Sequence, residues 1–159
     1  MAFVFLVLWR ATMKRLIFGS IVLFLASIAA AQVNTHLKLV TGNSFSGYTV
    51  EGATKIDVST AKSLHDRGVR FIDARFEGDW KKSHIPGASN LIAAWVTEEA
   101  LMKIVGKDEE VVFYCDGADC SASPYACAKA LSLGYEKVYY FAEGYPGWEA
   151  AGHPIEIAK

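Results

Sequence analysis

The chain has 159 residues, a formal net charge of -1, 52% hydrophobic and 21% charged residues. This length and composition suit one globular domain with a substantial core. No extended cluster of Lys or Arg follows residue 15. The sequence therefore argues against nucleic-acid binding and against a role on membrane surfaces.

The N-terminal part has the features of a secretory signal peptide, which we place at residues 1–31. Lys14 and Arg15 precede an apolar run that ends in three alanines, the small residues that signal peptidase accepts before Gln32. The run is shorter than the about 20 apolar residues of a membrane-spanning helix, so an uncleaved anchor is the alternative. Met13 is an alternative start of the chain.

Cleavage would leave a mildly acidic protein, because residues 1–31 hold three of the 16 basic residues and none of the 17 acidic ones. We expect a periplasmic or secreted protein without stable membrane association. In such an oxidising compartment paired thiols tend to form disulfides, and a count of three cysteines leaves one unpaired.

Residues 32–52 are polar and weakly periodic, and we interpret them as an N-terminal extension, either an extended leader or a peripheral strand. From residue 53 to 157, β-rich runs alternate with helical patterns, which predicts parallel strands joined by crossover helices. The predicted strands are residues 55–58, 69–73, 88–92, 111–115 and 137–141.

Three helices are predicted from capping signals. Ser59 is the expected N-cap of a helix that runs to Asp66 before Gly68, and Thr97 is the expected N-cap of a second. For the third, Ser123 is the expected N-cap, with Pro124 in the first turn; this helix would run to Leu133, with Gly134 behind it.

Cys115 directly follows the apolar run of the fourth predicted strand. Ligands of open parallel sheets bind beyond the carboxyl ends of the strands, and a helix N-terminus offers N–H groups to an anion. We therefore predict that Cys115 is an ionised nucleophile. The alternative is a buried cysteine that only ends a core strand.

The other two cysteines have different expected roles. Cys120 lies close enough in sequence to form a disulfide with Cys115 or to act as its resolving thiol. Cys127 falls on the core face of the predicted helix and is the expected unpaired thiol. No metal site is predicted, because no further Cys or His lies at ligand spacing, and no cofactor is expected.

Three ordered motifs together resemble the rhodanese-like domain family. Asp73-Ala74-Arg75 resembles its Asp-x-Arg triplet, and the stretch from His84 to Ala88 resembles its His-Ile-Pro-Gly-Ala turn, preceded by Ser83 where Gly is usual. Cys115 after VVFY takes the position of the active cysteine. Trp148 and the Gly152-His153-Pro154 triplet match the closing element.

The resemblance implies an α/β fold with a five-stranded parallel sheet flanked by helices. It also implies a sulfurtransferase in which Cys115 accepts sulfane sulfur from a small donor, holds it as a persulfide and passes it to a thiol, to another acceptor or to a redox protein. The active loop would comprise Asp116, Gly117, Ala118, Asp119, Cys120 and Ser121, with Asp73 and Arg75 in supporting roles.

The loop departs from the family pattern Cys-Arg-x-Gly-x-Arg-Ser. It reads CDGADCSAS, is longer by two residues and contains no basic residue from Cys115 to Ala128. Two carboxylates beside the sulfur disfavour a dianionic donor such as thiosulfate. The loop resembles that of a rhodanese subgroup with a second cysteine in this position.

Other functions remain open at this point. A phosphatase would need cationic neutralisation of the phosphoryl oxygens, which this loop lacks. A non-catalytic binding or redox module with a Cys115-Cys120 disulfide is the main alternative, and thiol-disulfide exchange without extra sulfur is another. We expect His84 to be a hydrogen-bonded turn residue and Trp148 to pack in the core or at its rim.

Overall fold

The computed structural model describes residues 37–40 and 47–158. The predicted signal peptide and the first residues of the predicted extension lie outside these ranges. Within them, no helix combines the length and the apolar character needed to cross a membrane.

Five parallel strands form the main sheet, in the order β3-β7-β6-β4-β5. The predicted α/β fold with a five-stranded parallel sheet is thus confirmed. The central strand β6 is fully buried, which explains its continuous apolar run VVFY. The strands are β3 (Thr54–Ile56), β4 (Arg70–Asp73), β5 (Ser89–Asn90), β6 (Val111–Tyr114) and β7 (Val138–Phe141).

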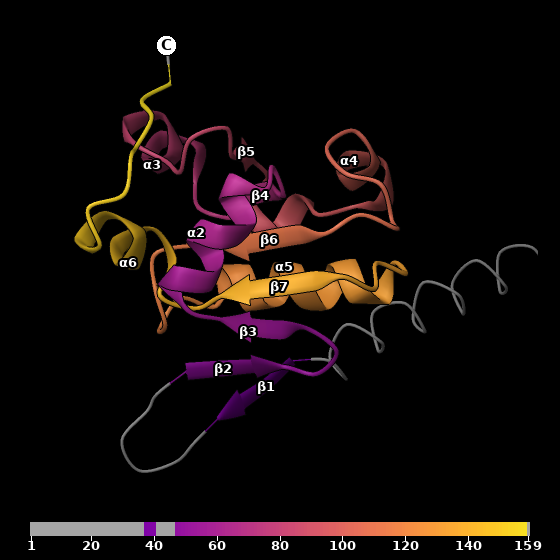
Figure 1. Cartoon of the computed structure of the whole chain (residues 1–159). Coiled ribbons are helices and arrows are strands. Elements are labelled where there is room, and N and C mark those ends of the chain that lie inside the picture. The colour runs from indigo at the N-terminus through magenta and orange to yellow at the C-terminus, as the bar shows by residue number, and fades with distance from the viewer. Residues whose placement is uncertain (1–36, 41–46, 159) are drawn as a thin grey trace, which may run out of the picture. The chain divides into compact units, whose positions relative to one another are not determined.

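Helices cover both faces of this sheet. Figure 1 shows α2 in front of the sheet and α5 behind it. Residues of β6 alternate between two core clusters, one with α5 and one with α2 and α6. The helices are α2 (Val58–Asp66), α3 (Glu77–Lys82), the 3-10 helix η1 (Ala93–Trp95), α4 (Glu98–Met102), α5 (Ala122–Ser132) and α6 (Gly144–Ala150).

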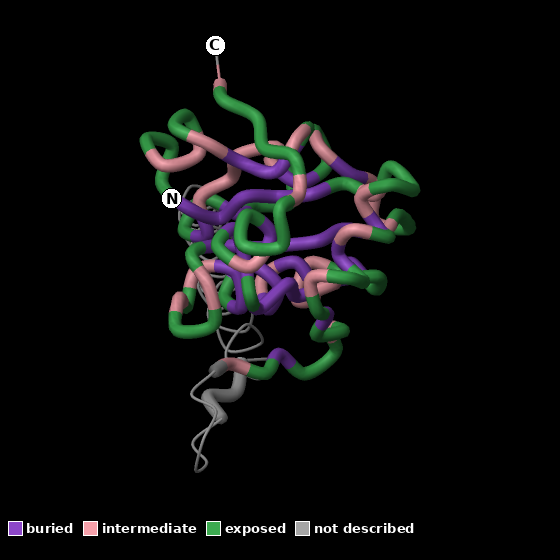
Figure 2. Tube along the Cα trace, turned by 60° about the vertical axis from the view of Figure 1, so that its left-hand side comes forward, coloured by how far each residue is buried: buried purple, intermediate pink, exposed green. Residues whose placement is uncertain are grey.

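Burial follows this layering. Figure 2 shows buried segments running through the interior and exposed segments around them, and the residues of β4, β6 and β7 are mostly buried. The two faces therefore carry the cores, and the ends of the strands carry the loops that reach solvent.

A separate antiparallel pair precedes the main sheet. It consists of β1 (Leu37–Val40) and β2 (Gly47–Val50). The pair agrees with the peripheral-strand interpretation of residues 32–52.

Two of the three predicted helix starts are wrong. The N-cap of α2 is Asp57, whose carboxylate accepts from the Thr60 amide at 2.8 Å, and Ser59 donates to that carboxylate instead of capping. Helix α5 begins at Ala122, one residue before the expected cap, because Ser123 is engaged elsewhere. Thr97 caps α4 as predicted, by accepting from Ala100.

Candidate active site

Cys115 lies at the carboxyl edge of the sheet, directly after β6. Its main chain is fixed by α6, because the Tyr145 amide donates to the Cys115 carbonyl at 2.9 Å. The preceding Tyr114 points to the opposite face, where its hydroxyl accepts from the Ile85 amide at 3.2 Å. The position of the cysteine is therefore set by three separate segments.

The Cys115 sulfur is enclosed, with the residue only 1% exposed. It lies 2.9 Å from Ser123 Oγ, and its thiol donates to the Cys120 carbonyl at 3.5 Å. Ser123, in the first turn of α5, acts to lower the pKa of Cys115 but does not offset the larger effects of Cys120 and burial. This use of the Ser123 hydroxyl explains why the residue does not cap the helix.

Cys120 forms the other half of a thiol pair. Interaction with the Cys115 side chain and with the amides of Ala122 and Asp116 lowers the pKa of Cys120 to about 6. Interaction with Cys120, together with burial, raises the pKa of Cys115. All three cysteines are unbridged in the structure.

The two pKa values shift in opposite directions. Burial and the interaction with Cys120 raise the pKa of Cys115, which opposes the predicted ionisation of Cys115, whereas the pKa of half-buried Cys120 is lowered. That Cys115 is the nucleophile stays a prediction.

A cation reaches the acidic loop from β4. Arg75 Nη1 lies 3.8 Å from Asp116 Oδ1, a contact that the loop sequence alone does not reveal. Burial raises the pKa of Asp116, and Arg75 opposes this shift. Sequence reasoning missed the contact because the two residues are distant along the chain.

The Arg75 charge is largely committed to Asp73. Its Nε and Nη2 donate to the buried Asp73 carboxylate at 3.0 and 2.7 Å, and Nη2 also donates to the Ser83 carbonyl at 2.7 Å. The guanidinium lies 4.5 Å from the Tyr145 ring centroid. These contacts make Asp73 and Arg75 the scaffold of the site and leave it without a free positive charge.

Three other residues singled out in the sequence take structural positions. His84 Nδ1 contacts the Trp80 carbonyl at 2.8 Å, in a turn. Trp148 is buried and donates to the Pro154 carbonyl at 2.7 Å. Cys127 is buried inside α5, and burial raises its pKa. The predicted core positions of Trp148 and Cys127 are confirmed.

Gly144 is a further residue of the site that the sequence did not single out. It has a φ of 61°, and an added Cβ would overlap the Cys115 carbonyl oxygen and lie 2.8 Å from the Gly117 amide nitrogen. The backbone of α6 thus packs directly on the active loop. The sequence shows a glycine here but not the approach that requires it.

An apolar pocket of about 350 Å³ opens beside Cys120. Its walls come from residues 74–76 after β4, residues 92–94 around η1, and Asp116, residues 120–122 and Tyr125 of the loop and α5. Phe76 is 72% exposed at this pocket. Cys120 lines the pocket and Cys115 does not.

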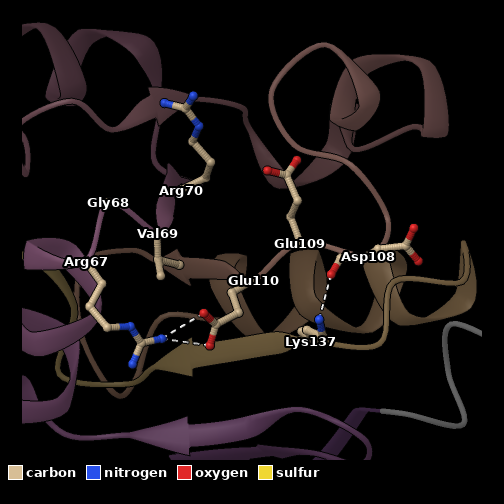
Figure 3. Close-up of a pocket in the computed structure, with 8 residues that line it drawn as sticks. All are labelled: Arg67, Gly68, Val69, Arg70, Asp108, Glu109, Glu110 and Lys137. Atoms are coloured by element: carbon tan, nitrogen blue, oxygen red, sulfur yellow. Dashed lines mark hydrogen bonds and ion pairs between the residues drawn. The ribbon is translucent and has the colours of Figure 1, made fainter.

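A second pocket lies at the opposite edge of the sheet, before β4, β6 and β7 (Figure 3). Basic and acidic side chains mix around it: Arg67 donates to both Glu110 carboxylate oxygens at 2.9 and 2.7 Å, and Lys137 donates to the main-chain carbonyl of Asp108 at 2.8 Å. These contacts leave it without a concentrated charge. Among residues 37–40 and 47–158, no cluster of three or more His, Cys, Asp or Glu could hold a metal.

Sequence comparison agrees with this fold. Residues 57–151 match the model of the rhodanese-like domain. The chain belongs to the rhodanese-like domain family.

Two relatives match the chain at 30% identity or more. Protein HIGH ARSENIC CONTENT 1, mitochondrial, of Arabidopsis thaliana is 30% identical over 65% of this chain and 66% of its own length. An HTH-type transcriptional regulator of Mycobacterium tuberculosis is 32% identical over 67% of this chain and 47% of its own length. The chain thus spans about half to two thirds of these relatives.

Solved structures share the fold at lower identity. A Bacillus halodurans protein is similar with a TM-score of 0.61 and 23% identity, over 66% of this chain and 77% of that one. Thiosulfate sulfurtransferase from Pseudomonas aeruginosa is similar with a TM-score of 0.55 and 18% identity, over 67% of this chain and 21% of that one. At these identities the likeness is one of fold, which the chain shares with both proteins.

Proposed function

We propose that the protein is a rhodanese-type sulfurtransferase that holds sulfane sulfur as a persulfide on Cys115. The observation that carries the proposal is the placement of two cysteines at the carboxyl edge of the sheet, with Cys115 Sγ 2.9 Å from Ser123 Oγ in the first turn of α5 and Cys120 lining the apolar pocket. Such a setting stabilises a sulfur anion, which is the reactive form of a thiol and of a persulfide.

The chemistry needs no metal or cofactor. A cysteine thiolate of the loop attacks the outer sulfur of a donor, the donor's sulfur-sulfur bond breaks, and the donor leaves as its thiolate. A thiol acceptor, either small or on a redox protein, later attacks the outer sulfur of the persulfide and frees the cysteine thiolate.

The charges favour sulfur transfer over phosphoryl transfer. A phosphoryl group needs cations around its oxygens, and Arg75, the cation that contacts the loop, already pairs with buried Asp73. Asp116 adds a negative charge beside it. An uncharged sulfur donor avoids this repulsion.

Mass spectrometry of the loop peptide tests the proposal. After reduction and exposure to a sulfane donor, the wild-type protein should gain one sulfur atom that maps to Cys115, and should pass it to cyanide or a thiol. A Cys115→Ser/Cys120→Ser double variant should gain none, and Cys127→Ala should behave as wild type. If the wild-type protein takes up no sulfur from any donor, the alternative of a non-catalytic binding or redox module holds instead.

We also propose that the protein acts after export, in the periplasm or outside the cell. The support is the basic pair and apolar run of residues 14–31. Comparing the N-terminus of the protein from culture or periplasmic fractions with Gln32 tests this part separately. A full-length protein retained in the cytoplasm would refute it.

A further inference from the structure

We propose that sulfur enters the site at Cys120, and that the apolar pocket beside it binds the uncharged body of an organic hydropersulfide. The inference rests on the proposed function and names its entry point and donor class. It follows from which cysteine lines the pocket, from the apolar residues that form the pocket walls, and from the charged side chains at the pocket.

Access favours Cys120 as the residue that meets the donor. Cys115 is 1% exposed and is covered by Ser123 Oγ, the Cys120 carbonyl and the rest of the loop. Cys120 is half-buried and lines the pocket. A donor in the pocket would therefore meet Cys120 before Cys115.

The ionisation state of the pair supports the same order. Interaction with the Cys115 side chain and with the amides of Ala122 and Asp116 lowers the pKa of Cys120 to about 6, which favours a thiolate on a residue that lines the pocket. Burial contributes to the raised pKa of Cys115. In the resting pair, half-buried Cys120 is thus the residue that meets a donor as a thiolate.

The walls define the class of donor. Phe76, Ile92, Ala93 and the Tyr125 ring offer apolar surface, and the volume of about 350 Å³ suits a small organic molecule. The charged side chains at the pocket are Arg75, which is bound to Asp73, and Asp116, whose side chain is 60% exposed. An anionic body would meet no free cation here, whereas an aromatic or aliphatic body would bury its surface.

The transfer is a simple displacement. The Cys120 thiolate attacks the outer sulfur of R–S–SH, giving Cys120–S–SH and R–S⁻, which takes a proton from solvent. The Cys115 thiol then attacks the outer sulfur in turn, giving Cys115–S–SH, and its proton passes to the departing Cys120 sulfur. No oxidant or reductant enters either step.

Single-turnover loading of the reduced protein tests the entry point. Benzyl hydropersulfide serves as the uncharged donor, and sulfur is located by fragmentation of the loop peptide. We expect Cys115→Ser to take up one sulfur, on Cys120, within about threefold of the wild-type rate, and Cys120→Ser to load at least about tenfold more slowly. Loading of Cys120→Ser at the wild-type rate would refute entry at Cys120.

Donor selectivity tests the pocket. We divide the rate at which each donor loads the protein by the rate at which the same donor reacts with a small free thiol. This ratio removes differences in the intrinsic reactivity of the donors. Phe76→Ala and Tyr125→Ala should each slow loading from benzyl hydropersulfide by about fivefold to tenfold and leave loading from thiosulfate within about twofold. The matched control is Met102→Ala, an exposed apolar residue that does not line the pocket.

The outcomes separate this inference from the proposed function. Equal effects of Phe76→Ala on both donors, or none on either, would refute the pocket as the donor subsite while sulfur transfer itself stands. Absence of sulfur on both cysteines of the wild-type protein with every donor would refute the proposed function.

Discussion

At the scale of single residues, the interaction between Cys115 and Cys120 makes the two thiols differ. With the loop amides it lowers the pKa of Cys120 to about 6, and with burial it raises the pKa of Cys115. The pair thus holds one negative charge at neutral pH, on the sulfur that contacts the pocket. A single titration step of this kind belongs to the pair and depends on both members.

The pH dependence of alkylation should show this step. Because the pKa of Cys120 is lowered to about 6, its thiolate forms as the pH rises through that value, so the iodoacetamide reaction rate should rise there and level off above about pH 7. An ordinary cysteine would continue to gain reactivity up to about pH 8.5.

The Cys115→Ala variant is the control for the cause of the shift. It removes the thiol that donates to Cys120, so the inflection should move to higher pH, with the two loop amides retaining part of the effect. Peptide mapping of the alkylated site checks that Cys120 reacts. If the inflection stays at the same pH in the variant, the interaction with the Cys115 thiol is not the main cause of the lowered Cys120 pKa.

At the scale of elements, the active loop is supported from α6 through the main chain. The Tyr145 amide binds the Cys115 carbonyl, and Gly144 leaves no space for a Cβ at the loop. The loop's shape is therefore fixed by an element that follows it by some 30 residues in the sequence.

Replacement of Gly144 tests this support. Gly144→Ala should combine left-handed strain of about 1–2 kcal/mol with overpacking of about 1–3 kcal/mol against the loop, and should slow sulfur loading. Chemical denaturation and the loading assay measure the two effects.

Gly152→Ala is the matched control. Gly152 has a φ of 73° but open space where a Cβ would lie, so only the strain applies and loading should stay at the wild-type rate. Equal stability losses in the two variants would show that contact with the loop adds nothing.

The sequence predicted the sheet well because parallel strands buried on both faces need continuous apolar runs such as VVFY. It misplaced helix starts where two polar residues compete, since the better cap at Asp57 displaced Ser59, and sulfur contacts engaged Ser123. The short helices α3 and α6 were not predicted, because neither has a side-chain N-cap hydrogen bond to mark its start.

The candidate site was predicted only in part. The position of Cys115 follows from the strand before it, which is local information. The contact of Arg75 with Asp116, the Gly144 packing and the apolar pocket all join segments that are distant in the chain. No periodicity or spacing within one segment carries that information.

At the scale of the whole molecule, the Asp73-Arg75 pair links much of the carboxyl edge of the sheet. Asp73 belongs to β4, and Arg75 contacts the Ser83 carbonyl, the active loop at Asp116 and the Tyr145 ring of α6. A buried pair of this kind costs free energy when one partner is lost, because the other remains buried without its counter-charge.

Removal of Asp73 tests this role. Asp73→Ala should lower the free energy of unfolding by roughly 3–5 kcal/mol, measured by chemical denaturation of the reduced protein. The exposed Lys62-Asp66 pair of α2 provides the control, since Asp66→Ala removes a carboxylate that water already screens and should have a far smaller effect. Similar losses in both variants would contradict the structural role of the buried pair.

The burial of Cys127 limits which disulfides the folded protein forms under oxidation. Three thiols allow three alternative pairings in an unfolded chain. In the fold, Cys127 is buried in α5 with its sulfur 3.8 Å from the Tyr139 carbonyl oxygen, whereas Cys115 and Cys120 lie before that helix. While the fold is intact, Cys127 therefore cannot form a disulfide with Cys115 or Cys120. Oxidative damage is then channelled toward Cys115 and Cys120, where any bridge stays reversible by an ordinary reducing thiol.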